Sequence, residues 1–283
     1  MSPASRALAW DYSRVAGAYL LRPGYAPAAI DAIVGLARLS PGALVADVGA
    51  GTGNLVCPLL DRSLRVVAIE PDGEMRRRGK QRTAGRSDVR WSASRAESMP
   101  FDDGCFDAVT FGSSFNVVDQ PRAIAESARV TRPGGFLACL WNHRCLDDPL
   151  QAAIEETIRR RVPGYSHGSR RSDPSAAMLD GGWFDGVRAI EAGIVHTMPR
   201  SDFVSAWASH LTLRRQAGPG FEAVLGAIER LLCAEAPAIL EVPYLTRAWV
   251  ARRTTRSNPI GRGTGSSRPR GGFRPCGTAR SRS

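Results

Sequence analysis

The sequence lacks the cysteine patterns that mark metal sites and disulfide frameworks. It contains six cysteines, and no two of them form a Cys-x-x-Cys pair. The two that are nearest in sequence, Cys139 and Cys145, do not have the set of histidine partners that a zinc site needs. We therefore expect the cysteines to be reduced and mostly buried as small hydrophobic residues, and we expect no metal site.

Long apolar runs are also missing. No segment approaches the roughly 18 apolar residues of a membrane-spanning helix, and the first residues lack the apolar core of a signal peptide. Hydrophobic residues make up 43% of the chain and charged residues 23%, a balance that excludes a disordered chain or a collagen. We expect a globular, cytoplasmic protein with no membrane partner.

Acidic residues are absent from the last part of the chain, which explains the net charge of +11. Residues 251–283 contain nine arginines and no Asp, Glu or Lys, whereas residues 1–250 hold 29 basic and 27 acidic residues. With one aromatic residue, this Arg-rich tail cannot bury enough surface to offset the entropy of ordering, so we expect it to be disordered. A phosphate-binding tail is the alternative, but the nearly neutral body favours a protein with no nucleic-acid partner.

Apolar strands alternate with helical patterns along the chain. Strands are expected at 44–48, 65–69, 89–93, 106–111, 136–141, 187–198 and 242–250. Helices are expected at 8–20, 27–39, 54–60, 72–81, 121–130, 148–161, 201–210 and 221–234. Strands separated by helices predict an α/β fold, with a doubly wound, mostly parallel sheet that helices cover on both faces.

A glycine-rich loop, Asp47-Val48-Gly49-Ala50-Gly51-Thr52-Gly53, follows the first strand. Open α/β sheets bind ligands at this position. A dinucleotide fingerprint needs glycine where this chain has Asn54. The carboxylate of Asp47 would repel a pyrophosphate but suits a ligand that bears an ammonium and a sulfonium group. The loop therefore favours S-adenosylmethionine over NAD, and NAD stays open as the alternative.

An acidic residue, Glu70, ends the second strand and should lie beside this loop. A carboxylate there can accept hydrogen bonds from both hydroxyls of a ribose. Read alone, such an acid is equally consistent with a solvated pair at a helix start, but it gains weight after the Asp47 loop.

Four motifs in order, VADVGAGTGNL, VVAIEPDGEM, AESMPFDDGCFDAV and ESARVTRPGGFL, resemble the class I S-adenosylmethionine-dependent methyltransferases. The similarity covers about residues 8–142 and lies in the branch of the ubiquinone and menaquinone biosynthesis methyltransferases and many small-molecule methyltransferases of bacterial secondary metabolism. It implies a Rossmann-like, seven-stranded sheet. It also implies that the methionine part is held by Asp47, Gly49, Ala50, Gly51 and Gly53, the ribose by Glu70, and the adenine by Pro71, Met75, Ala96 and Glu97. Ser113 would lie near the sulfonium, and Tyr12, Tyr19 and Arg22 would fold over the cofactor, with Arg22 pairing its carboxylate.

Two departures from the family pattern affect the expected chemistry. Arg95 stands where relatives often have an acid that contacts the adenine amino group, and Asn116 stands where some relatives have a histidine. We interpret Asn116, together with His143 after the fifth strand, as the candidate catalytic residues.

The sequence therefore predicts a methyltransferase that acts on a small acceptor, such as a bacterial natural-product intermediate of antibiotic biosynthesis. The scarcity of bases favours N-methylation, because an amine need only be neutral, while O-methylation and C-methylation of a quinone-like ring stay open.

Residues 1–40 would form lid helices, 41–142 the cofactor-binding core, and 143–250 the acceptor pocket and closing strands of the same domain. We expect a monomer or homodimer. The rival interpretations are an NAD-dependent oxidoreductase, a non-catalytic binding protein and a nucleic-acid methyltransferase.

Overall fold

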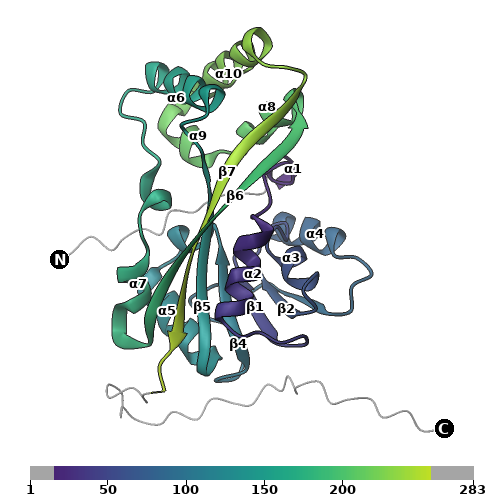
Figure 1. Ribbon diagram of the computed structural model, residues 1–283, viewed down its shortest axis with the longest axis vertical. Helices are drawn as coiled ribbons and strands as arrows, with labels where there is room; N and C mark the ends of the chain where they lie inside the picture. The colour runs from purple at the N-terminus through teal and green to yellow at the C-terminus, as the bar shows by residue number, and fades with distance from the viewer. Residues whose placement is uncertain (1–15, 256–283) are drawn as a thin grey trace.

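A seven-stranded sheet forms the centre of the structure (Figure 1). The computed structural model describes residues 16–255. The strand order is β3-β2-β1-β4-β5-β7-β6; β1 to β5 pair in parallel, and β7 is antiparallel to both β5 and β6. The strands are β1 Leu44–Val48, β2 Arg65–Ile69, β3 Val89–Ser92, β4 Phe106–Gly112, β5 Thr131–Arg144, β6 Phe184–Pro199 and β7 Ile239–Arg253. The predicted α/β fold with a mostly parallel, doubly wound sheet is confirmed.

The described helices are α1 Ala16–Tyr19, α2 Pro27–Leu36, α3 Val56–Leu60, α4 Gly73–Arg82, α5 Gln120–Val130, α6 Pro149–Arg161, α7 Ser175–Leu179, α8 Arg200–Ala208, α9 Leu211–Ala217 and α10 Phe221–Glu235. Asp72, Asp119 and Asp148 begin α4, α5 and α6, because each carboxylate accepts a hydrogen bond from a backbone N–H of the first turn. Between residues 16 and 255, no helix has the length and apolar character needed to cross a bilayer.

Two apolar cores cover the two faces of the sheet. The neighbours Val45 and Ala46 of β1 point to opposite faces and join different cores. Val45 packs with Ile30 of α2 and Leu59 of α3, whereas Ala46 belongs to the core that contains Ile124 of α5. Four of the five β1 residues are buried, so the strand reads as a continuous apolar run.

Three strands are longer than the sequence pattern predicts. β5 extends past the end of β4, because Gly112 is the last β4 residue and pairs with Leu140. Residues 141–144 of β5 therefore project beyond the carboxyl edge of the parallel strands, and β6 and β7 continue further as a two-stranded ribbon. The β6 residues alternate between exposed and half-buried positions for most of its length, and the strand begins three residues before and ends one residue after the predicted range.

Four helices, α6, α8, α9 and α10, pack at the end of this ribbon and are called the cap (Figure 1). They enclose a third apolar core, which contains Ile158, Phe203, Trp207 and Ile228. Helices α9 and α7 were not predicted, because they have only seven and five residues, too few for a clear helical period. The ribbon thereby holds the cap over the carboxyl edge of the sheet.

The disordered tail was predicted to start at residue 251, but β7 continues beyond that residue. The strand runs to Arg253, whose Nε donates a hydrogen bond to the Ala128 carbonyl at 2.9 Å and whose guanidinium lies 5.2 Å from the ring centroid of Trp183. Residues 251–253, which composition alone assigns to the tail, are therefore held in β7 by these contacts and by pairing with β6. Residues 256–283 and the N-terminal residues 1–15, including Tyr12, lie outside the described residues.

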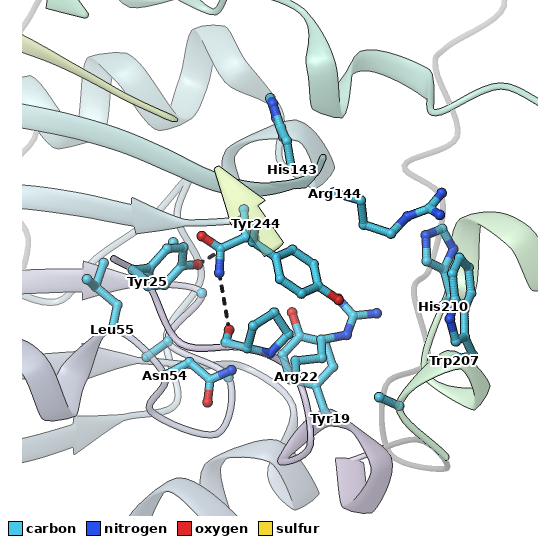
Figure 2. A pocket seen from close by; sticks show the side chains of 18 of the residues that line it. Tyr19, Arg22, Tyr25, Asn54, Leu55, His143, Arg144, Trp207, His210 and Tyr244 are labelled. Carbon is cyan, nitrogen blue, oxygen red and sulfur yellow. Dashed lines mark hydrogen bonds between the residues drawn. The ribbon is translucent and has the colours of Figure 1, made fainter. Parts of the chain in front are cut away.

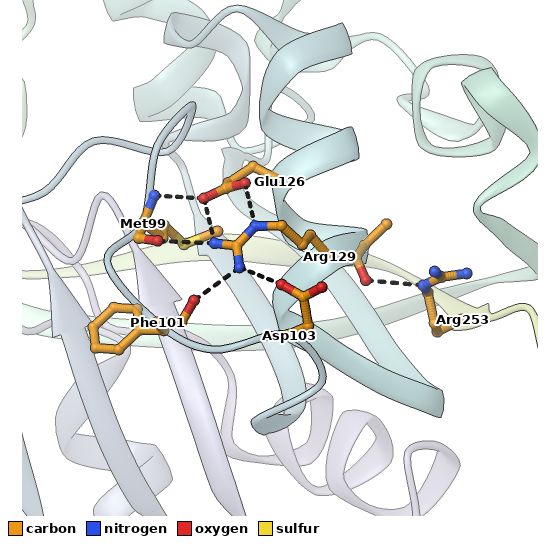
Figure 3. Close-up of polar contacts among 7 residues, drawn as sticks. Met99, Phe101, Asp103, Glu126, Arg129 and Arg253 are labelled. Atoms are coloured by element: carbon orange, nitrogen blue, oxygen red, sulfur yellow. Dashed lines mark hydrogen bonds and ion pairs between the residues drawn. The ribbon is translucent and has the colours of Figure 1, made fainter. Parts of the chain in front are cut away.

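Arg129 of α5 joins two of the motifs that carry the family resemblance (Figure 3). Its guanidinium donates hydrogen bonds to the backbone carbonyls of Met99 and Phe101, at 2.9 and 2.8 Å. The same group forms ion pairs with Glu126 and Asp103, at 2.8 and 2.7 Å. Glu126 in turn accepts a hydrogen bond from the Met99 N–H at 2.6 Å. The network fixes the loop between β3 and β4 against α5.

Replacing Arg129 with methionine should lower the free energy of unfolding by about 2–3 kcal/mol, because the loop carbonyls and Glu126 lose charge-assisted partners. Chemical denaturation measures this loss. The matched control is Arg122→Met on the exposed surface of the same helix, which should change stability by less than about 0.5 kcal/mol. Equal effects of the two variants would contradict a stabilising role for the network.

Candidate functional site

A cavity of about 150 Å³ lies between the carboxyl ends of β1 and β4 and the cap (Figure 2). The sheet side is lined by Asp47, Gly49, Ala50, Gly51, Asn54, Leu55, Gly112 and Ser113. The end of α1 and the segment between α1 and α2 contribute Tyr19, Arg22, Pro23 and Tyr25. The far side is lined by Asn142, His143, Arg144, His167, Arg171, Phe203, Ala206, Trp207, His210 and Tyr244.

The loop after β1 presents its backbone to the cavity. The N–H groups of Gly49 and Ala50 both donate to the Ile69 carbonyl, at 2.8 and 3.0 Å, which ties the loop to the end of β2. Gly49 has a φ of 69°, and a Cβ atom at this position would lie 2.4 Å from Cβ of Ser114. The turn therefore requires glycine at residue 49.

Glu70 lies directly behind this loop at the end of β2. Its Oε2 accepts a hydrogen bond from the Gly51 N–H and its Oε1 accepts one from the Asp72 N–H, both at 2.8 Å. Burial raises the pKa of Glu70, and the two N–H donors act in the opposite direction. The carboxylate is thus held at the carboxyl edge by the loop that it contacts.

Asp47 places a second buried carboxyl at the same edge. Its Oδ1 accepts a hydrogen bond from Thr110 Oγ1 at 2.9 Å, whereas its Oδ2 is buried and has no hydrogen-bond partner in the described part of the chain. Burial raises the pKa of Asp47 to about 7, the Thr110 hydrogen bond lowers it, and the charge of Glu70 adds to the increase. An unpaired carboxylate oxygen in this position favours a cationic neighbour.

The segment that follows α1 crosses the mouth of the cavity. Asn142 Nδ2 donates to the Gly24 carbonyl at 2.6 Å, which fixes the segment to the end of β5. Arg22 donates to the hydroxyl and the carbonyl oxygen of Ser209, at 2.8 and 2.6 Å, and its guanidinium stacks over the Tyr19 ring at 4.1 Å. Arg22 therefore connects this segment to the cap.

The far end of the cavity is basic and aromatic. Arg144 pairs with Glu155 at 2.6 Å and lies over the Trp207 ring, 4.7 Å from its centroid. Arg171 donates a hydrogen bond to the Arg144 carbonyl at 3.0 Å. Burial raises the pKa of Tyr244 to about 12, so its hydroxyl stays protonated and can donate a hydrogen bond. Figure 2 shows the Tyr244 ring directed toward Arg22.

The structure brings part of the predicted cofactor site into the cavity lining: Tyr19, Arg22, Asp47, Gly49, Ala50, Gly51 and Ser113. The other predicted residues, Gly53, Glu70, Pro71, Met75, Ala96 and Glu97, are not part of that lining. Ala96 is buried in the core on the α5 face, and Glu97 accepts a hydrogen bond from the Asp119 N–H at 3.0 Å.

The two candidate catalytic residues lie in different surroundings. His143 lines the cavity and is 6% exposed. Asn116 is not among the lining residues, and its Oδ1 accepts a hydrogen bond from Trp141 Nε1 at 3.0 Å. Sequence reasoning missed Arg144, Arg171 and Tyr244, which come from distant segments, and no local motif marks them. Within residues 16–255, no group of three or more His, Cys, Asp or Glu side chains is arranged to hold a metal ion.

Comparison with known proteins gives the class to which this site belongs. Residues 46–139 match the family model described as a methyltransferase domain. An uncharacterized methyltransferase of Mycobacterium tuberculosis is 40% identical over 145 residues, which cover 51% of this chain and 57% of the relative. A demethylmenaquinone methyltransferase of Paenarthrobacter aurescens is 32% identical over 204 residues, which cover 64% of this chain and 79% of the relative.

A solved structure of a candidate type II methyltransferase from Anaeromyxobacter dehalogenans shares the fold. It has a TM-score of 0.57 and 20% identity, and the match covers 82% of this chain and 97% of that one. The chain belongs to the class I S-adenosylmethionine-dependent methyltransferases, in the branch that contains the ubiquinone and menaquinone biosynthesis methyltransferases. This membership assigns S-adenosylmethionine as its cofactor. Several of the curated relatives are matched over little more than half of their length.

The residues at the carboxyl edge fit this cofactor. The unpaired Asp47 Oδ2 suits its ammonium group, and the loop at Gly49 and Gly51 allows close approach to the backbone. Glu70 lies at the end of β2 against the Gly51 N–H, where a carboxylate can accept hydrogen bonds from the hydroxyls of a ribose. The loop, Asp47 and Glu70 would therefore hold the cofactor.

The raised pKa of Asp47 predicts that affinity for S-adenosylhomocysteine depends on pH. Below pH 7 the folded, ligand-free protein keeps Asp47 protonated, so binding of an ammonium group must displace a proton. We expect the affinity to be about tenfold weaker at pH 6 than at pH 8. The stability of the ligand-free protein changes with pH in the opposite direction to the affinity. Because the pKa of Asp47 is raised from 3.8 to about 7 in the folded protein, the stability contributed by the neutral carboxyl is lost as pH rises through 7.

Calorimetric titration of the wild type and of Asp47→Asn at both pH values measures this effect. The variant should bind more weakly and show little pH dependence between pH 6 and pH 8. Asp102→Asn, which replaces an exposed carboxylate, should behave as the wild type. A wild-type affinity that is constant from pH 6 to pH 8 would show that Asp47 does not contact the ammonium group.

Proposed function

We propose that the protein transfers a methyl group from S-adenosylmethionine to a small-molecule acceptor held at the cap end of the cavity. The observation that carries this proposal is a single cavity that joins the cofactor residues of β1 to the cap. When bound, the cofactor supplies an activated methyl group. The rest of the cavity combines aromatic side chains, such as Phe203 and Trp207, with polar groups that include His143 and Tyr244, as a small-molecule site does.

The charges around the cavity support N-methylation. Arg22, Arg144 and Arg171 line it, whereas Asp47 is the only acidic residue in its lining among residues 16–255. A positive field lowers the pKa of an amine and keeps it in the neutral, nucleophilic form. The acceptor amine then needs no dedicated base, and the cap excludes water from it. We propose that this acceptor is a natural-product intermediate of bacterial secondary metabolism.

Two other acceptor atoms are supported by particular observations. The same positive field would lower the pKa of a phenol, and the buried His143 would then be a candidate base for O-methylation. The Paenarthrobacter aurescens relative is named as a demethylmenaquinone methyltransferase, which favours C-methylation of a quinone-like ring. His143 is proposed to contact the acceptor in each case.

Labelled methyl transfer to three series of acceptors, aromatic amines, phenols and hydroquinones, distinguishes these outcomes. We expect labelled amine products, and we expect His143→Gln to keep a rate within about tenfold of the wild type at pH 8, because a neutral amine needs no base. His196→Gln is the matched control, because His196 lies on β6 outside the cavity lining.

Labelled phenols together with a loss of more than about a hundredfold in His143→Gln would instead identify O-methylation with His143 as the base. Labelled ring carbons would identify C-methylation. Absence of transfer to all three series by a protein that binds the cofactor would contradict the proposed activity.

A further inference from the structure

Arg144 has more hydrogen-bonding capacity than its neighbours satisfy. Its side chain is 10% exposed and its Nη2 pairs with Glu155 Oε2 at 2.6 Å. Its Nη1 is buried and has no hydrogen-bond partner in the described part of the chain. A buried guanidinium N–H without an acceptor is destabilising, so an acceptor atom that entered beside Arg144 would be stabilised.

Arg171, unlike Arg144, forms no ion pair with a carboxylate among residues 16–255. Its Nη2 donates to the Arg144 carbonyl at 3.0 Å, and no carboxylate lies within 4.0 Å of its nitrogen atoms. Burial lowers the pKa of Arg171, and the positive charge of Arg144 lowers it further. Arg144 and Arg171 both line the cavity, and their charges are only partly compensated.

Glu155 is the nearby acid, and it is already shared among three basic groups. Its carboxylate lies 2.6 Å from Arg144, 3.1 Å from Arg159 and 3.2 Å from His167 Nε2. Burial raises the pKa of Glu155, but His167 and Arg144 outweigh this effect and lower the pKa to about 2. One ionised carboxylate cannot neutralise Arg144 and Arg171 together, so this end of the cavity stays positive.

Two further side chains line this end of the cavity. Tyr244 has a protonated hydroxyl that can donate a hydrogen bond to an anion, and Trp207, whose ring stacks with His210 at 5.2 Å between centroids, adds an aromatic wall. Arginine forks match the two oxygens of a carboxylate or phosphate, and aromatic walls bind the apolar body that carries such a group.

We propose that the methyl acceptor carries an oxyanion, a carboxylate or a phosphate, which binds between Arg144 and Arg171. This inference rests on the proposed function, because it names the chemical class of the acceptor for the same cavity. The oxyanion would hold the acceptor by its far end and leave its nucleophilic atom directed toward the cofactor residues of β1.

Binding of matched acids and amides to the full-length protein saturated with S-adenosylhomocysteine tests this proposal. Saturation keeps the carboxylate of that ligand from competing for the arginines. The probes are 4-hydroxybenzoate, phenyl phosphate and the neutral 4-hydroxybenzamide, each titrated by calorimetry. We expect at least one oxyanion to bind at least tenfold more tightly than the amide, a difference of about 1.4 kcal/mol. The two oxyanions distinguish a carboxylate site from a phosphate site.

The decisive variant is Arg171→Gln, because Arg171 forms no ion pair whose loss would disturb the fold. We expect the preference for the oxyanion to fall below about threefold in this variant. Arg159→Gln is the matched control: Arg159 contacts the same Glu155 but is 54% exposed and does not line the cavity. It should keep the full preference.

Three results would overturn the proposal: equal binding of acid and amide by the wild type, a preference that survives in Arg171→Gln, or no binding of either oxyanion at about 10 mM. Failure to bind S-adenosylhomocysteine would instead contradict the proposed function. The same titrations on the protein without that ligand would then still test the anion site.

Discussion

The antiparallel pairing of β7 with β5 and β6 is the constraint on which the rest of the structure depends. Of the five parallel strands, β5 continues past the end of its neighbour β4, beyond Leu140. Because β7 runs in the opposite direction, its first residues also lie beyond the edge and pair there with the end of β6. The ribbon so formed holds the cap over the loop at Gly49. Cap residues therefore form the wall of the cavity opposite this loop.

Charge is separated along the cavity that this arrangement creates. Asp47 lines the sheet end, with the Glu70 carboxyl directly behind the loop, and Arg144 and Arg171 line the cap end. A positively charged cofactor and an electron-rich acceptor would each meet the sign of charge that stabilises them. The two ends also differ in construction. The sheet end is built from consecutive residues of one loop, whereas the cap end collects side chains from β5, a 3₁₀ turn, α8 and β7.

This difference decides what could be predicted from the sequence. The β1 loop and Glu70 are short local motifs whose residue types suit a particular ligand chemistry. One sequence alone therefore indicates a ligand site at the carboxyl edge of the sheet. The order and type of the elements followed from apolar periodicity, and the full length of β5 did not, because its last residues, 142–144, are polar. Arg144 and Tyr244 are brought together by the register of β5 and β7, and Arg171 comes from the short 3₁₀ helix Gly168–Arg171, so no local pattern encodes the group.

The central claim is that the loop at Asp47 binds S-adenosylmethionine and not a dinucleotide. Calorimetric titration of the full-length protein with S-adenosylhomocysteine, and separately with NAD, tests it most directly. The account predicts micromolar binding of S-adenosylhomocysteine and no detectable binding of NAD. Binding of NAD alone, or of neither compound, would contradict the assignment of the cavity.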